Sequence, residues 1–256
     1  MRNVLAICRR EIFSFFVSPV AYLVISGFVL LSAYFFFNLL GMYNLMLAQY
    51  SMMPSGAASA PNLNQWVVEG YYHTLLIILV FLIPMLTMRV VAEERRLGTF
   101  ELLATSPLKV SEIVLGKFLG VGFVVLLMVL AAGIFPLLLC VFGNPEVKPI
   151  LCGLAAVALC ALGFTSLGVA ISAFTENQIV AAVSGMVVLL LLYVIQQPAE
   201  SVGGNVAAVL NYLSPVMQAK DMIRGVVSLQ NLVYFASLMG LGIFVCQRAL
   251  EAQRWR

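Results

Sequence analysis

The chain has 256 residues, of which 62% are hydrophobic and only 10% are charged, whereas an ordinary soluble domain carries about 25% charged residues. The mean hydropathy is +1.05. A compact soluble domain of this length could not bury so much apolar side chain beneath a surface with so few charged residues. This composition excludes a soluble enzyme, a disordered protein, a nucleic-acid-binding protein and a coiled coil. It predicts an all-α, polytopic membrane protein.

Residues 1–19 form the first predicted element. Leu5, Cys8, Ile12 and Phe15 follow the spacing of one helical face, while Arg9, Arg10 and Glu11 group elsewhere. This pattern is typical of a helix that lies in the headgroup layer, with its arginines directed to anionic lipid. A plain extension of the next helix is the alternative, which Ser18-Pro19 disfavours because proline restricts the residue before it.

Uncharged runs long enough to cross an apolar layer about 30 Å thick recur along the chain and predict six transmembrane helices. We place them at residues 20–40, 71–88, 118–142, 150–174, 178–196 and 231–247. The intervening segment 41–69 contains several Asn, Gln and Pro residues and is predicted to be a loop. All six helices would belong to one transmembrane domain covering residues 1–256.

Lys and Arg residues orient these helices, because cytoplasmic segments carry an excess of positive charge. With both termini inside, the cytoplasmic segments hold 11 of the 14 Lys and Arg residues, and the outer segments hold only Lys148, Lys220 and Arg224. The sequence therefore predicts a multi-pass protein of a bacterial cytoplasmic membrane with both ends in the cytoplasm.

The predicted cytoplasmic segment 89–117 holds nine of the 25 charged residues. Gly98 interrupts a helical pattern, and Thr99 can then cap a short amphipathic helix over 99–105. Ser106-Pro107 ends that piece and starts the next helix, while Phe100 and Leu103 share an apolar face. A solvated charged loop is the alternative.

Residues 197–230, on the outer side, are too apolar for an ordinary loop. Val206, Val209, Leu210 and Leu213 share one helical face that stops at Ser214-Pro215, and a second short helix over 215–224 would end at Gly225. These two pieces predict a hairpin that dips into the outer leaflet, and a loop on the outer surface stays open.

Residues that could carry chemistry are sparse. No P-loop, zinc motif or nucleophile motif occurs, the single histidine His73 is assigned a structural role, and we expect no catalytic, metal or cofactor site. A disulfide between Cys140 and Cys152 stays open. Gly116-xxx-Gly120 would let one helix approach a neighbour closely. Five polar residues are candidates for hydrogen bonds between helices, namely Asn38, Thr165, Ser166, Ser172 and Ser184.

The stretch 81–117 resembles ABC transporter permeases of the type-2 exporter class, and is most similar to the gliding-motility-associated subgroup. The family pattern is carried by Glu93-Glu94-Arg95, Gly98-Thr99, Glu101-Leu102-Leu103, Ser106-Pro107 and Ile113 with Gly116-Lys117. Phe15 to Tyr22 and the stretch from Tyr212 to Val227 also match, so the resemblance spans essentially the whole chain.

The resemblance implies that the 99–105 helix is a coupling helix that docks on a separate ATPase. Partners would be a pair of ABC-type ATPase subunits carrying ATP and magnesium, a second permease subunit, identical or homologous, and membrane lipid; an extracytoplasmic accessory protein stays open. The implied docking residues are Glu93, Glu94, Arg95, Arg96, Gly98, Thr99, Phe100, Glu101, Leu103, Ser106 and Pro107.

The function that this resemblance implies is that of a non-catalytic permease subunit of an exporter whose substrate is unidentified. A complex that transmits force or serves as a scaffold, without moving a solute, is the alternative. A membrane-embedded enzyme would need polar catalytic residues clustered at an interface, and the sequence shows none. A channel would conduct without an ATPase.

Overall fold

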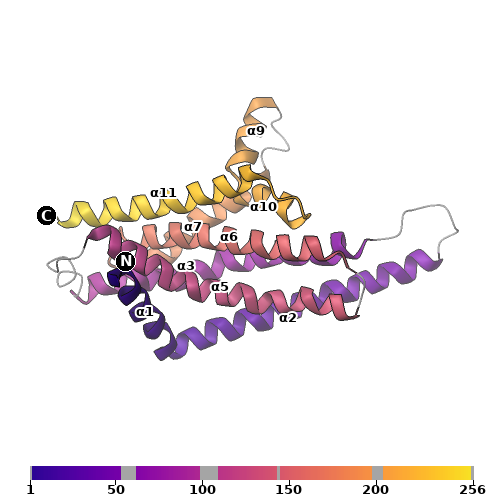
Figure 1. Cartoon of the computed structure of the whole chain (residues 1–256), viewed down its shortest axis with the longest axis horizontal. Coiled ribbons are helices and arrows are strands. Elements are labelled where there is room, and N and C mark those ends of the chain that lie inside the picture. Colours follow the sequence, from indigo (N-terminus) through magenta and orange to yellow (C-terminus); the bar gives the residue numbers. More distant parts are fainter. Residues whose placement is uncertain (1, 53–61, 99–108, 143–144, 198–203, 255–256) are drawn as a thin grey trace.

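The computed structural model describes residues 2–52, 62–98, 109–142, 145–197 and 204–254, and within these ranges the chain is helical with no strand. Its longest helices run alongside one another as a bundle (Figure 1). They are α2 (Pro19–Met52), α3 (Gly70–Arg96), α5 (Val110–Phe142), α6 (Val147–Ser172), α7 (Gln178–Val194) and α11 (Leu229–Arg254). A π-helical turn, η1 (Asn64–Glu69), leads directly into α3.

Five of these helices are long and apolar enough to cross a membrane, and α7 is a shorter apolar helix of 17 residues. The described part of the chain thus confirms a multi-helix membrane protein. The sixth crossing, through α7, stays a prediction because about 20 residues are usually needed to span the hydrocarbon layer.

Several predicted boundaries are wrong, and the helices run further than expected. Residues 41–52 continue α2 and residues 64–69 form η1, although both lie in the predicted loop 41–69. Asn44 and Gln49 do not end a helix, because scattered polar residues remain on a solvated or headgroup-facing side while Leu, Met and Ala sustain helical geometry. By contrast, residues 89–96 belong to α3, which ends just before Gly98 as the helical pattern predicted, and residues 110–117 belong to α5.

The remaining boundaries shift by smaller amounts. The helices predicted at 150–174 and 178–196 end at Ser172 and Val194, and the last one, predicted at 231–247, extends over Leu229–Arg254. Polar and charged residues beyond an apolar run can continue the same helix, so the apolar run marks the middle of a helix better than its ends.

Helix α6 lies at the centre of the bundle and packs against α3, α5, α7 and α11. Small residues make this packing close. A Cβ atom at Gly153 would lie 2.3 Å from the ring of Tyr72, and one at Gly168 would lie 2.4 Å from the hydroxyl of Thr87. Glycine at these two positions therefore sets the distance between α3 and α6.

The N-terminal helix α1 (Arg2–Val17) is separate from α2, because the chain bends at Ser18 before Pro19. The predicted break is therefore confirmed. Figure 1 shows α1 and the C-terminal end of α11 at the same end of the bundle. The last turn of α3 and the first turns of α5 also lie there, since α1 contacts both through side chains described below.

Two short helices, α9 (Gly204–Leu213) and α10 (Pro215–Ile223), occupy the predicted hairpin region 197–230. Ser214 caps α10 by accepting a hydrogen bond from the Met217 N–H, and Gly225 follows with a positive φ of 88°. Helix α10 is buried against α6, whereas α9 projects away from the bundle (Figure 1). The two helices are as predicted, and their depth in a bilayer stays a prediction.

Candidate functional site

The predicted docking residues begin on the last turns of α3. Glu93, Glu94, Arg95 and Arg96 lie there, and Gly98 follows with a φ of 70°. The Leu97 and Gly98 N–H groups bond to the carbonyls of Glu93 and Arg95, so a glycine in left-handed geometry ends the helix. The other predicted docking residues lie outside the described residues: Thr99, Phe100, Glu101, Leu103, Ser106 and Pro107.

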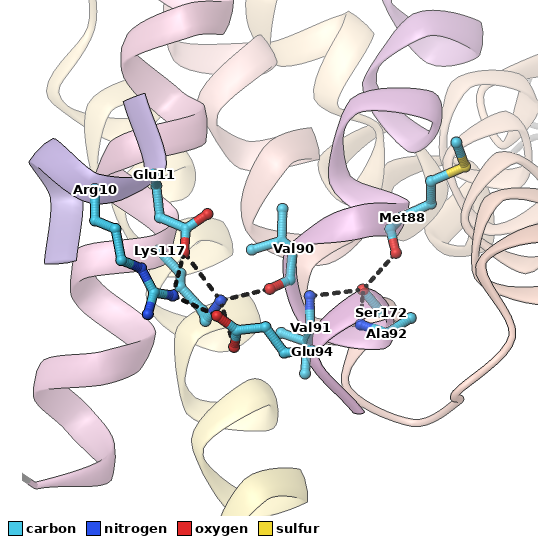
Figure 2. Close-up of polar contacts among 9 residues, drawn as sticks. All are labelled: Arg10, Glu11, Met88, Val90, Val91, Ala92, Glu94, Lys117 and Ser172. Atoms are coloured by element: carbon cyan, nitrogen blue, oxygen red, sulfur yellow. Dashed lines mark hydrogen bonds and ion pairs between the residues drawn. The ribbon is translucent and has the colours of Figure 1, made fainter. Parts of the chain in front are cut away.

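A buried ion cluster joins α1, α3 and α5 at this end of the bundle (Figure 2). The ammonium of Lys117 lies 3.1 Å from the Glu11 carboxylate and 2.8 Å from the Glu94 carboxylate, and it also donates to the carbonyl of Val90. Arg10 bridges the same two carboxylates. We call Arg10, Glu11, Glu94 and Lys117 the ion cluster.

Three of the four side chains in the ion cluster are largely shielded from solvent. The side chain of Lys117 is only 1% exposed, and those of Glu11 and Glu94 are 11% and 16% exposed. Two cations face two carboxylates, so the cluster is neutral as a whole. Because a buried charge is costly without a partner, the three helices are constrained to stay together.

Arg10 remains charged in this setting. Partial burial by itself would lower the pKa of its guanidinium, but hydrogen bonds and the negative charge of Glu11 and Glu94 outweigh burial and raise that pKa above its ordinary value. The sequence predicted that Arg9 and Arg10 would both reach anionic lipid. Arg10 instead binds carboxylates of the protein, and Arg9 is exposed.

Glycines bring α1 into this position. A Cβ atom at Gly116 would lie 2.7 Å from the Ile7 side chain, and one at Gly120 would lie 2.6 Å from Cβ of Glu11. The close approach predicted for Gly116-xxx-Gly120 is therefore confirmed, and its partner is α1. Since Lys117 lies between these glycines, the same contact that brings α1 close also places Glu11 beside the ammonium.

A second attachment holds the end of α3 to α6. The Ser172 hydroxyl accepts hydrogen bonds from the N–H groups of Val91 and Ala92, at 3.3 and 3.1 Å, and donates to the Met88 carbonyl at 3.1 Å (Figure 2). Among the five polar candidates, Ser172 and Ser166 bond to neighbouring helices, whereas Thr165 and Ser184 bond to their own.

Replacing Ser172 with Ala should destabilise the protein by about 1 kcal/mol, the usual net value of a buried hydrogen-bonded hydroxyl. The control is Ser184→Ala, because that hydroxyl bonds only to carbonyls of its own helix, those of Val180 and Ala181. Thermal unfolding in detergent measures both variants. An equal loss in the two would show that the α3–α6 link contributes nothing.

The predicted docking charges differ in their surroundings. Glu94 belongs to the ion cluster, and Arg95 donates to the Ala173 carbonyl and to Glu176, each at 3.0 Å. Glu93 is half-buried and Arg96 is exposed. Among the residues that the structure describes, Glu94 and Arg95 therefore have partners within the chain.

Sequence reasoning missed the ion cluster. Glu11 and Lys117 were assigned to an interfacial helix and a cytoplasmic segment, and neither was given a partner. One signal in the sequence could have indicated the cluster, namely that Lys117 lies within the Gly116-xxx-Gly120 spacing. A helix that packs closely against those glycines must place a partner beside the Lys117 ammonium.

A cleft of about 420 Å³ opens beside the ion cluster between α1 and α3. Arg10, Glu11 and Phe15 line it from α1, and Arg89 and Glu93 line it from α3. Across the parts of the chain that the structure describes, no group of three or more His, Cys, Asp or Glu residues could hold a metal ion. The geometry here suits holding helices together and binding a charged group.

The comparison with known protein families gives a match. The model of the family described as ABC-2 family transporter protein matches residues 49–246, which is more than half of the chain. No curated protein matches. The matched range includes the long helices α3, α5, α6 and α7 and the region between α3 and α5. The chain therefore belongs to the ABC-2 family of transporters, as a non-catalytic, multi-pass membrane permease subunit of an ABC system.

Proposed function

We propose that this permease couples ATP hydrolysis on a separate ATPase subunit to the export of an unidentified substrate across the cytoplasmic membrane. The observation that carries the proposal is the ion cluster, which joins α1, the end of α3 and the start of α5 at the helix ends that flank residues 97–109. A force applied between α3 and α5 would therefore move α1 as well.

The docking segment in this proposal is the end of α3 together with residues 99–107. Phe100 and Leu103 would fill a groove of the ATPase as apolar anchors, and Glu101 and Arg96 would make charge pairs at the rim. Desolvated aromatic anchors usually contribute more to binding than rim charges do, so we expect Phe100 to dominate. The docking side would be cytoplasmic, with both termini on that side, and two permease subunits would act with two ATPases.

Conformational change would follow from the attachments of α3. Closure of the ATPases would pull the docking segment and tilt α3 and α5 together, because Lys117 and Glu94 hold their ends to each other. Ser172 and Arg95 would pass the motion to α6, the central helix of the bundle. A path for the substrate would then open between the two permease subunits.

Co-purification with the partner ATPase tests the docking proposal. Phe100→Asp and Glu101→Arg should lose the ATPase while the permease still inserts and is recovered in normal amounts. The matched control is Val226→Asp, because Val226 is an exposed apolar residue far from the docking segment. Its neighbour Gly225 has a Cβ position 3.5 Å from Pro149, which lies at the opposite end of α6. Intact complexes in both docking variants would refute the proposal.

A further inference from the structure

The cleft between α1 and α3 carries a pair of charges that the ion cluster does not use. Arg10, Glu11 and Glu94 line it but already have ionic partners. Arg89 and Glu93 also line it, and neither forms an ion pair within the described ranges of the chain. Arg89 donates a hydrogen bond to the Ser18 hydroxyl at 3.4 Å.

Arg89 and Glu93 lie four residues apart on α3, so they share one face of that helix. They point a guanidinium and a carboxylate into the same space without forming a salt bridge with each other. A bound group that carries both a negative and a positive charge would satisfy both of them. A purely anionic group would meet the guanidinium groups of Arg89 and Arg10 but would also lie near three carboxylates, those of Glu11, Glu93 and Glu94.

The surroundings of the cleft are those of a membrane interface. Around the bend at Ser18, Phe13 and Val17 of α1 and Leu23 of α2 are 66 to 72% exposed. Phe16 and Tyr22 form an edge contact across the bend, with ring centroids 6.1 Å apart. Exposed apolar side chains and paired aromatic rings are typical of the level where headgroups meet acyl chains.

We infer that this cleft binds the headgroup of a zwitterionic phospholipid that carries a phosphate and a primary ammonium, as phosphatidylethanolamine does. Arg89 binds the phosphate, since guanidinium groups match phosphate oxygens. Glu93 accepts hydrogen bonds from the ammonium. The acyl chains leave the cleft past Phe13 and Val17. A volume of about 420 Å³ lies within the usual range of small-molecule sites. This inference does not depend on ATPase coupling, and it gives Glu93 a role in lipid binding instead of docking.

Lipid titration of the purified full chain in detergent, followed by native mass spectrometry, tests the inference. Three phospholipids with identical acyl chains are compared: phosphatidylethanolamine, phosphatidylcholine, which has no N–H donor, and phosphatidylglycerol, which has no cation. We expect phosphatidylethanolamine to bind about tenfold more tightly than either, the ratio that one charge-assisted hydrogen bond supplies.

Two variants assign the contacts. Arg89→Gln should weaken the binding of all three lipids. Glu93→Gln should weaken the binding of phosphatidylethanolamine about tenfold and that of phosphatidylcholine by less, because the choline group loses only its charge attraction and no hydrogen bond. The control is Arg9→Gln, an exposed arginine on α1 that does not line the cleft. Thermal unfolding without added lipid checks that each variant is folded.

Three results would overturn the inference. The first is tighter binding of phosphatidylglycerol than of phosphatidylethanolamine. The second is an unchanged lipid preference in Glu93→Gln. The third is a Glu93→Gln variant that loses the ATPase while it binds lipid as the wild type does, since this would make the cleft a protein-binding site. A Glu93→Gln variant that loses the lipid preference while it still binds the ATPase supports the inference. This result is independent of the test of the coupling proposal.

Discussion

Replacing Lys117 with Met is expected to lower the free energy of unfolding by about 3–5 kcal/mol, the usual cost of removing one partner from a buried ion pair. The Met side chain fills most of the space of the lysine, so the loss comes from charge. Glu11 and Glu94 would be left with Arg10, whose side chain is 52% exposed and attracts them less strongly through solvent. Reversible unfolding in mixed micelles measures the change.

Two further variants make this result specific to the ion cluster. Lys148→Met removes an exposed lysine at the start of α6 and should change the free energy of unfolding little. Adding Glu94→Gln to Lys117→Met removes one of the two carboxylates that have lost Lys117 as a partner. The double variant should recover part of the loss, since the free-energy effects of substitutions at contacting residues are not additive. If the double variant were less stable by the sum of both single losses, the cluster would not act as a unit.

Replacing Gly120 with Leu is expected to separate α1 from α5. A Cβ atom alone would lie 2.6 Å from Cβ of Glu11, and the larger side chain has no room unless α1 moves away. Overpacking of this kind costs about 1–3 kcal/mol, and any displacement of Glu11 from Lys117 adds to it. The control is Gly240→Leu on α11, because nothing lies within 4 Å of the Cβ position there.

The thiol of Cys8 reports this separation directly. Burial, with a smaller contribution from the negative charge of Glu11, raises the pKa of Cys8, so little thiolate is present at neutral pH and maleimide should react slowly. When α1 moves away, both effects weaken, the pKa falls towards its ordinary value, and labelling should become faster. Peptide mapping distinguishes Cys8 from the other four cysteines. Equal labelling rates for Cys8 in wild type and Gly120→Leu would contradict this account.

The helical bundle could be predicted because its signals are local. Apolar runs marked the centre of each long helix, and Ser214-Pro215 and Gly225 marked the limits of α10 correctly. The predicted end of α2 was wrong because nothing in the chain distinguishes a helix inside the bilayer from the same helix continuing beyond it. Asn44 is polar, yet it lies on this continuation.

The candidate site was less predictable because it depends on contacts between distant parts of the chain. The approach of Gly116 and Gly120 to another helix followed from their spacing, but the identity of that helix did not. Glu11 appeared to belong to a solvated face together with Arg9 and Arg10, and only the packing of α1 on α5 turns it inwards. Local periodicity has no means of pairing Glu11 with Lys117.

Coupling in the proposed function requires that the segment after α3 contacts the ATPase subunit. A photo-crosslinking amino acid placed at Phe100 of the permease, in membranes that contain the assembled complex, tests this contact directly. The same residue placed at Val226, at the opposite end of α6, serves as the reference position. We predict a crosslink to the ATPase from position 100 and none from position 226. No crosslink from position 100, or equal crosslinks from both positions, would contradict the account.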